Sequence, residues 1–369
     1  MKKTAIITFH AAHNYGAVLQ AYALQQIILR FGFQCDIIDI LTKQEKNNLN
    51  IIKPTFKFNG LMKNLLSLYY YKQLKEKYRL FQKFIHNNLI LTVQSFSSCK
   101  EIENANLDYD YYISGSDQIW NHKFIDNDLS FFLSFVKKGI KIAYAPSVGS
   151  GKDIEQIPII NQVQKHLKDN NYLSARDITT ADIIERLTNK KVKIVLDPTL
   201  LLDTNDLLKI TSPKKHKDKY IFFYVVKNHK YYYKIARKIS EYLKLPVITS
   251  TLTGKGDFFN GFKFDFAAGP SEFISLIQNA EFVVTSSFHG TIFSILNKKP
   301  FICMDAKNDI RLSNLLSLLD LDKRSATLEN LNDILPFIYD IDFDKVNQKL
   351  LQHKKYSMDF LKSVLDIKD

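Results

Sequence analysis

Short apolar runs alternate with amphipathic helical patterns from the start of the chain. Thr4–Phe9 is a β-branched and apolar run that predicts a strand. In Gly16–Arg30 the apolar residues recur at helical spacing, and Gly32 closes the expected helix. Cys35–Ile40 predicts the next strand. This βαβ order is typical of a parallel, doubly wound sheet.

The same alternation continues in two series along the chain. The first series predicts strands at Tyr109–Ser114, Lys141–Ser147, Tyr172–Ala175 and Lys193–Leu196, and helices at Ile157–Lys168 and Thr180–Leu187. The second predicts strands at Tyr220–Val226, Pro246–Ser250, Phe282–Ser286 and Pro300–Met304, and helices at Tyr231–Leu243, Ser271–Gln278 and Gly290–Leu296. Between them, Pro213–Lys219 combines a proline with repeated charge and is the expected linker.

These patterns predict an α/β protein with two Rossmann-like, doubly wound domains that face a cleft. A chain of 369 residues exceeds what one hydrophobic core usually serves, which agrees with two domains. We expect an N-terminal domain over residues 1–205, with a lysine-rich helical insertion near 41–100, and a C-terminal domain over 206–330. Residues 331–369 form a helical tail that we expect to pack back on the N-terminal domain.

The composition is that of a globular protein, with 46% hydrophobic and 24% charged residues. Three scattered cysteines indicate neither a disulfide framework nor a zinc site. The apolar run at the N-terminus is too short for a signal peptide, and no apolar stretch reaches the roughly 18 to 20 residues that span a bilayer. We therefore expect a cytoplasmic protein.

The formal net charge of +13 raises the question of an anionic partner. The lysines are spread along the whole chain, and the sequence contains no helix-turn-helix or RNA-binding signature, so we expect no nucleic-acid partner. A peripheral contact with the inner face of the plasma membrane is compatible with this charge. Each basic residue near an anionic lipid surface contributes about 1 kcal/mol.

Polar loops follow several of the predicted strands. Ligands of open parallel sheets bind at the carboxyl ends of the strands, so these loops are the places to look for chemistry. In the first series the polar loops are His10–Gly16, Ser114–Asn121, Ser147–Gly151 and Ser174–Asp177, and in the second series Thr285–Gly290.

The loop Thr285–Gly290 follows a strand and opens a helix. Its N–H groups and the hydroxyls of Ser286 and Ser287 can hold a phosphate or carboxylate at the positive end of the helix. His289 can act there as a general acid. Alternatively, Ser287 caps the helix and His289 donates to a neighbouring carbonyl group, and the spacing alone does not decide between these roles.

Arg176 stands at a predicted strand end, where its planar guanidinium group can hold a phosphate or carboxylate with two hydrogen bonds. The alternative is a local ion pair with Asp177 or Asp182. From the sequence alone the ion pair is slightly favoured.

Two further loops are equipped to hold a sugar. Asp117, Gln118 and Trp120 offer hydrogen-bonding groups and a ring for stacking, although a structural cap with a buried Trp120 is an equal alternative. His13, Asn14 and Tyr15 follow the first strand, and Gly16 permits close approach of the backbone to a ligand. We expect both loops to contact the sugar. A G-x-G-x-x-G dinucleotide fingerprint is absent from the sequence.

Taken in order, several segments resemble the polysaccharide pyruvyltransferase family. They are Ile7–His10, Asn14–Tyr22, Ser114–Asn121, Tyr144–Ser147, Ser174–Asp177, Leu196–Thr199, Ser287–Gly290 and Pro300–Phe301. The resemblance implies a GT-B-like arrangement, phosphoenolpyruvate as donor and no metal in the chemical step. It also implies that the family's arginine and histidine correspond to Arg176 and His289. Many members carry an arginine where this chain has Ser287.

The resemblance implies that pyruvate is transferred to a sugar of a capsular or exopolysaccharide precursor to form a cyclic ketal with release of phosphate, and the expected acceptor is a lipid-linked oligosaccharide. His289 would protonate the donor, Arg176 with the Ser286–Gly290 loop would hold its anionic groups, and Asp117 would act as base toward the acceptor. The rival functions are a GT-B glycosyltransferase that uses a nucleotide sugar, and a non-catalytic sugar-binding relative.

Overall fold

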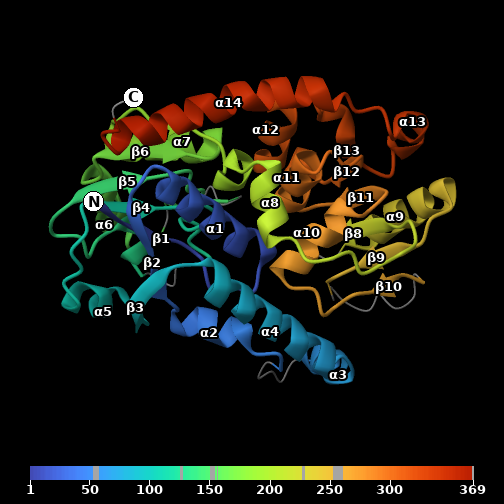
Figure 1. Ribbon diagram of the computed structural model, residues 1–369, viewed down its shortest axis with the longest axis horizontal. Coiled ribbons are helices and arrows are strands. Elements are labelled where there is room, and N and C mark those ends of the chain that lie inside the picture. Colours follow the sequence, from blue (N-terminus) through green and yellow to red (C-terminus); the bar gives the residue numbers. More distant parts are fainter. Residues whose placement is uncertain are drawn as a thin grey trace. The chain divides into compact units, whose positions relative to one another are not determined.

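The computed structural model describes residues 1–52, 58–124, 128–149, 154–155, 157–226, 229–251 and 261–367. They form two compact units (Figure 1). The first unit comprises residues 1–49, 85–202 and 351–369, and the second comprises 50–84 and 203–350. Neither unit is a continuous stretch of chain.

The first unit is built on a parallel sheet of seven strands in the order β3-β2-β1-β4-β5-β6-β7. The strands are β1 Lys3–Ile7, β2 Gln34–Ile40, β3 Leu91–Phe96, β4 Tyr111–Ser114, β5 Ile140–Ala143, β6 Tyr172–Ala175 and β7 Lys193–Ile194. The helices are α1 Tyr15–Arg30, α2 Lys43–Leu49, α5 Cys99–Asn104, α6 Ile160–Lys168 and α7 Ile178–Thr188, with 3₁₀ turns at Ser130–Phe132 and Pro198–Leu201. The predicted doubly wound α/β architecture is confirmed.

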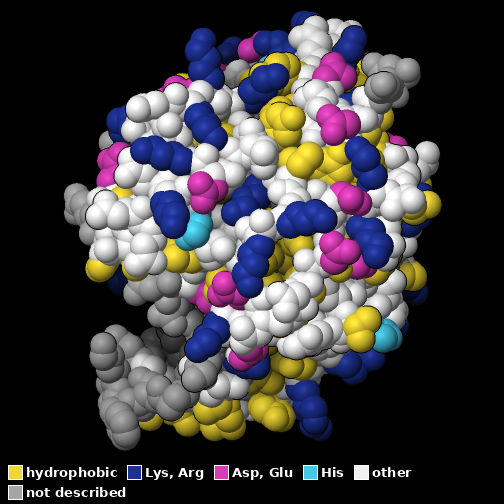
Figure 2. Space-filling model, turned by 90° about the vertical axis from the view of Figure 1, so that its left-hand side faces the viewer, with side chains coloured by type: hydrophobic (Ala, Val, Ile, Leu, Met, Phe, Trp, Pro, Cys, Tyr) yellow, Lys and Arg dark blue, Asp and Glu magenta, His cyan; other side chains and the backbone are white. Residues whose placement is uncertain are grey.

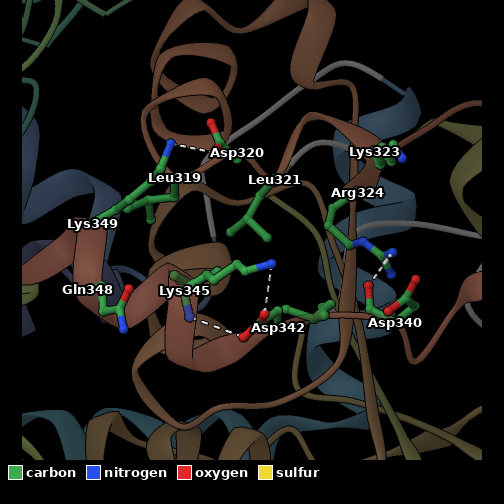
Figure 3. A pocket seen from close by; sticks show the side chains of 12 residues that line it. Leu319, Asp320, Leu321, Lys323, Arg324, Asp340, Asp342, Lys345, Gln348 and Lys349 are labelled. Carbon is green, nitrogen blue, oxygen red and sulfur yellow. Dashed lines mark hydrogen bonds and ion pairs between the residues drawn. The ribbon is translucent and has the colours of Figure 1, made fainter.

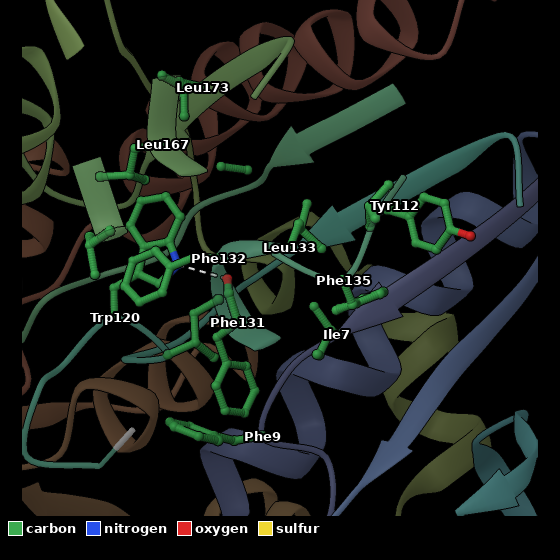
Figure 4. Packing of buried hydrophobic residues seen from close by; sticks show 14 of the residues in the cluster. Ile7, Phe9, Tyr112, Trp120, Phe131, Phe132, Leu133, Phe135, Leu167 and Leu173 are labelled. Atoms are coloured by element: carbon green, nitrogen blue, oxygen red, sulfur yellow. Dashed lines mark hydrogen bonds between the residues drawn. The ribbon is translucent and has the colours of Figure 1, made fainter. Parts of the chain in front are cut away.

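The core of the first unit is aromatic (Figure 4). Phe9 and Phe131 pack edge to face with ring centroids 4.9 Å apart, an arrangement that the ring quadrupoles favour. Tyr112 and Phe135 pack in the same way at 5.9 Å. The fully buried side chain of Ile7, at the end of β1, belongs to the same cluster. This core fixes the carboxyl ends of β1 and β4, from which two of the polar loops depart.

The second unit contains a parallel sheet in the order β10-β9-β8-β11-β12-β13. The strands are β8 Ile221–Tyr224, β9 Val247–Thr249, β10 Lys263–Phe264, β11 Phe282–Thr285, β12 Phe301–Met304 and β13 Ser325–Ala326. The helices are α3 Phe58–Tyr69, α8 Thr204–Ile210, α9 Lys230–Leu243, α10 Pro270–Gln278, α11 Phe288–Leu296, α12 Ile310–Leu318 and α13 Leu331–Ile334, with 3₁₀ turns at Ala306–Asn308, Asp322–Arg324 and Leu335–Phe337. This is the second Rossmann-like half.

The predicted insertion near 41–100 divides between the units. Residues 50–84, with α3 and most of α4 (Tyr71–Asn88), group with the second unit, where the rings of Tyr70 and Phe266 pack edge to face at 4.7 Å. Residues 85–100 belong to the first unit, and β3 forms the edge of its sheet. The insertion is therefore not one element of the N-terminal domain.

The predicted linker Pro213–Lys219 lies inside the second unit, because the chain leaves the first unit at Leu202. Lys215 and His216 place nitrogen atoms 2.6 and 2.9 Å from the two carboxylate oxygens of the buried Asp265. These contacts hold the segment on the second unit.

The tail also divides. Residues 331–350 group with the second unit and 351–369 with the first. The helix α14 (Phe343–Val364) contains the point of division. In the first unit, Lys354 donates to the carbonyl oxygen of Leu202 at 2.6 Å, and the Leu196 amide donates to Ser357 Oγ at 2.9 Å.

Within the described ranges, none of the helices has the length and apolar character that a membrane crossing requires. On the face shown in Figure 2, Lys and Arg side chains are interspersed with Asp and Glu.

Candidate functional site

In the first unit, three polar loops are tied together at the carboxyl ends of β4, β5 and β6. The Ser147 amide donates to the carbonyl oxygen of Asp117 at 2.8 Å, and the Arg176 amide donates to that of Pro146 at 3.1 Å. The parallel pairing of β4 with β5 and of β5 with β6 places these loops side by side. The first-unit cluster, defined as Asp117, Arg176 and Asp197, is built on this frame.

Arg176 forms the centre of the first-unit cluster. Its side chain is 2% exposed, and its Nη1 donates to Asp197 Oδ2 at 2.7 Å while Nη2 donates to Asp117 Oδ1 at 3.3 Å. Burial disfavours the charged guanidinium group, but the charges of Asp197 and Asp117 outweigh this and raise the pKa of Arg176. Arg176 is therefore held between two carboxylates.

Arg176 forms ion pairs with Asp117 and Asp197 instead of the sequence neighbours that were expected. Asp177, one of the expected partners, instead caps α7 by accepting from the Thr180 amide at 2.9 Å, and it accepts from Ser147 Oγ at 2.7 Å. The sheet order brings Asp117 and Asp197 to the guanidinium group instead. Both carboxylates bind the guanidinium group, so its charge is compensated within the cluster, and the donor-binding role of Arg176 stays a prediction.

Asp117 has the most exposed side chain of the cluster, at 12%, against 2% for Arg176 and 0% for Asp197. Its backbone lies in the left-handed region, with φ of 69°. Non-glycine residues rarely adopt this conformation, and it is concentrated at functional sites. Asp117 is thus the member of the cluster that can meet a ligand.

Gly115 determines the course of the chain into Asp117. Its φ is 135°, and a Cβ atom there would fall on the carbonyl oxygen of Tyr144. We expect Gly115→Ala to lower the free energy of unfolding by more than about 2 kcal/mol, measured by urea denaturation. Gly32→Ala is the control, because Gly32 has φ of 82° but a Cβ atom there would meet no other atom within 4 Å. Equal losses in the two variants would contradict a steric role for Gly115.

Trp120 is a core residue. It is 1% exposed, its Nε1 donates to the carbonyl oxygen of Phe131 at 2.9 Å, and its ring stacks on Phe132 at 5.4 Å (Figure 4). The buried alternative is therefore the one observed, and stacking of Trp120 on a sugar is wrong for this structure. Gln118 accepts a hydrogen bond from Asn121 Nδ2 at 3.0 Å and remains partly exposed.

The loop after β1 is mainly structural. Asn14 caps α1 by accepting from the amides of Gly16 at 2.9 Å and Ala17 at 3.4 Å. Tyr15 is 2% exposed, so its ring belongs to the core rather than to an acceptor site. His13 is partly exposed and stays a predicted acceptor contact.

A buried histidine in this loop was not predicted as a site residue. His10 is 1% exposed, and its Nε2 lies 2.9 Å from Asp39 Oδ1. The hydrogen bond to His10 lowers the pKa of Asp39. His10 opens a loop whose polarity was noted, whereas Asp39 lies within an apolar strand run that gave no sign of a partner.

In the second unit, the donor loop, defined as Ser286–Gly290, follows β11 and begins α11. Ser287 caps the helix, since its Oγ accepts from the Gly290 amide at 3.2 Å. The capping alternative is thus confirmed for Ser287. The Ser286 amide donates to the carbonyl oxygen of Tyr224 at 3.3 Å, which ties the loop to β8. Gly290 is required by packing, because a Cβ there would fall on Thr285 Oγ1.

His289 lies in the first turn of α11 and is 7% exposed. Its ring meets that of Phe288 edge to face at 5.3 Å. The guanidinium carbon of Arg311, in the first turn of α12, lies 5.9 Å from the centre of the Phe288 ring on the same unit. Arg311 itself is paired with Asp309 through bonds of 2.9 and 2.5 Å. The loop thus joins a histidine to the positive end of a helix.

A pocket of about 470 Å³ lies at the carboxyl ends of β12 and β13 in the second unit. Its lining includes Tyr231, Asp305 and Asn308, and Asp305 accepts from Asn308 Nδ2 at 2.7 Å. The charged side chains of Asp305, Lys307 and Glu329 also line it. None of these residues was predicted from the sequence as a site residue.

Another pocket, of about 240 Å³, lies where α12 and the start of α14 meet (Figure 3). Its charged groups are engaged with one another: Lys345 lies 3.4 Å from Asp342, and Lys349 pairs with Asp320. Arg324 donates to three backbone carbonyl oxygens. We place no reactant there. Among the described residues, no three His, Cys, Asp or Glu side chains come together in a group that could hold a metal ion.

Solved structures with a similar fold include proteins named as UDP-N-acetylglucosamine 2-epimerases. A putative UDP-N-acetylglucosamine 2-epimerase from Listeria monocytogenes aligns with a TM-score of 0.57 and 9% identity, over 100% of this chain and 97% of that one. MnaA from S. aureus with UDP gives 0.55 and 10%, over 100% and 98%. The UDP-GlcNAc 2-epimerase of Methanocaldococcus jannaschii gives 0.55 and 13%, over 96% and 100%. At such low sequence identity, the structural similarity shows the GT-B-like fold alone.

No curated protein matches the chain in sequence. The family model described as polysaccharide pyruvyl transferase matches residues 14–308, a range that includes both the first-unit cluster and the donor loop. The resemblance noted in the sequence is thereby confirmed, and the chain belongs to the polysaccharide pyruvyl transferase family.

Proposed function

We propose that this protein transfers the pyruvyl group of phosphoenolpyruvate to a sugar of a capsular or exopolysaccharide precursor, forms a cyclic ketal and releases phosphate. The observation that carries the proposal is the family match, which includes a histidine in the first turn of a helix that follows a parallel strand. This is where a parallel α/β fold binds anions.

The reaction needs one proton donor and two hydroxyl groups of the sugar. Protonation of the methylene carbon of phosphoenolpyruvate converts it to a methyl group and leaves a cationic carbon at C2. One hydroxyl oxygen bonds to C2 and gives its proton to a base. The C2–O bond to phosphate then breaks, the second hydroxyl oxygen bonds to C2, and the phosphate carries away the remaining proton.

His289 is the proposed proton donor to the methylene carbon. The donor loop and the N-terminus of α11 support it by stabilising the anionic groups of phosphoenolpyruvate. Asp117 is the proposed base toward the acceptor hydroxyl. Arg176 positions the Asp117 carboxylate, which is the role that its two ion pairs favour.

The acceptor is proposed to be a lipid-linked oligosaccharide. The formal net charge of +13 would favour approach to an anionic membrane surface on the cytoplasmic side.

The test is to incubate the protein with phosphoenolpyruvate and a panel of galactosides, mannosides and N-acetylmannosamine glycosides, and to follow phosphate release together with acceptor mass. Phosphate release matched by an acceptor that gains one pyruvyl ketal is the expected result. Binding of phosphoenolpyruvate without turnover on any acceptor would favour a non-catalytic sugar-binding relative. Binding of nucleotide sugars but not of phosphoenolpyruvate would favour a glycosyltransferase.

A further inference from the structure

We propose that Lys77, on helix α4, binds the phosphate group of the donor at the carboxyl edge of the second sheet. This inference rests on the proposed function and names a residue for it. The donor loop contains no lysine or arginine of its own, so its anion would otherwise depend on the helix N-terminus and on hydroxyl groups. Lys77 was not among the site residues predicted from the sequence.

Lys77 reaches the same sheet edge as the donor loop. Its Nζ donates to the carbonyl oxygen of Ser250 at 3.3 Å, and Ser250 directly follows β9. β9 pairs with β8, and β8 pairs with β11, whose end opens the donor loop. Neighbouring strands lie about 4.8 Å apart, so the ends of β9 and β11 are about 10 Å apart. A phosphate and a carboxylate on one small molecule can bridge much of this distance.

The surroundings of the Lys77 ammonium group suit an anion. The group donates to the carbonyl oxygen of Ser250, which places it beside the Ser250 side chain, and burial lowers the pKa of Lys77 to about 8. Beside it, Ser250 is 1% exposed, and among the described residues its Oγ makes no hydrogen bond. A buried hydroxyl without a partner is costly, and a phosphate oxygen would satisfy it. Lysine and serine together form a phosphate-binding pair.

Packing holds α4 in place on the second unit. A Cβ at Gly269 would lie 2.6 Å from Leu80 Cβ, so the backbone at Gly269 approaches α4 closely. The Tyr70 ring, just before α4, packs on Phe266. The packed helix therefore positions Lys77 at the edge of the sheet. Lys75, on the same helix, is exposed.

The experiment compares Lys77→Met with the matched control Lys75→Met in the full-length protein. Isothermal calorimetry gives the Kd for phosphoenolpyruvate, and inorganic phosphate is titrated separately as the probe of the phosphate subsite. We expect Lys77→Met to raise both dissociation constants by about 30-fold or more, because the proposed cationic partner of the phosphate group is lost. Lys75→Met should bind both as the wild type does.

Ser250→Ala keeps the test valid if Lys77→Met folds poorly. It removes a hydroxyl that bonds to no described group, so folding should be retained while the Kd for inorganic phosphate rises several-fold. If the wild type is active and both variants, Lys77→Met and Ser250→Ala, bind the two probes as the wild type does, this inference is wrong. The proposed function would then still stand. A wild type that binds no phosphoenolpyruvate would overturn both.

Discussion

Replacing His289 by alanine is expected to lower kcat for pyruvyl transfer by about 100- to 10,000-fold, the range that a general acid contributes. The reason is specific to this chemistry. Protonation of a carbon atom is the step that makes C2 electrophilic, and His289 lies in the first turn of α11, where anionic groups of the donor are held in the proposed mechanism. The measurement is steady-state phosphate release with saturating donor and an acceptor identified by the panel described above.

Two comparisons separate chemistry from packing at His289. His289→Gln fills most of the same volume but cannot protonate carbon, so it should be as inactive as the alanine variant. Both should bind phosphoenolpyruvate and keep the wild-type melting temperature within a few degrees, since Ser287 still caps α11. His86→Ala, at an exposed position, is the control. Retention of wild-type kcat in His289→Gln would remove the histidine from the mechanism.

Replacing Arg176 by methionine is expected to lower the free energy of unfolding by about 3–5 kcal/mol, the usual loss when one partner of a buried ion pair is removed. The Asp197 side chain is fully buried and that of Asp117 nearly so, and the variant leaves both without their guanidinium partner. Urea denaturation with a probe in the first unit measures the loss. Pyruvyl transfer should fall as well, because Asp117 loses the group that positions it.

Arg186→Met is the matched control for this ion pair. Arg186 lies 3.1 Å from Glu155, but its side chain is 57% exposed, and exposed pairs contribute at most about 1 kcal/mol. A double variant, Arg176→Met with Asp117→Asn, should recover part of the lost stability, because one unpaired buried charge is removed. If Arg176→Met and Arg186→Met lower the free energy of unfolding equally, burial of the Arg176 ion pairs does not increase their contribution to stability.

The alternation of strands and helices could be predicted because each element carries its own period of apolar residues. The strand at Tyr172–Ala175 has its predicted bounds, and the helical tail predicted over 331–369 contains the long helix α14 (Phe343–Val364). The edge strand β3 (Leu91–Phe96) was missed, since only Phe96 of its six residues is buried and the strand lacks the continuous apolar run of a buried strand. Its position beside β2 is decided by tertiary pairing.

The site was harder to predict than the fold, and Arg176 shows why. From the sequence, only neighbours such as Asp177 could be proposed as ion-pair partners. The observed partners are 21 and 59 residues away and meet Arg176 because parallel strands end at one edge of the sheet. Whether Trp120 is buried could not be predicted for a related reason. A tryptophan in a polar loop has the same local sequence pattern whether its ring faces solvent or, as here, lies in the core.

The division of each unit along the chain has a consequence for its biosynthesis. The first unit includes residues 351–369, with the buried Phe360, Leu361 and Leu365, so its core stays incomplete until these residues have been synthesised. The second unit likewise recruits residues 50–84, which are made long before its sheet exists. In the nascent chain, residues 50–84 must therefore remain able to pack on residues 203–350 when these are synthesised later. A chain truncated within the second unit would therefore lack parts of both units.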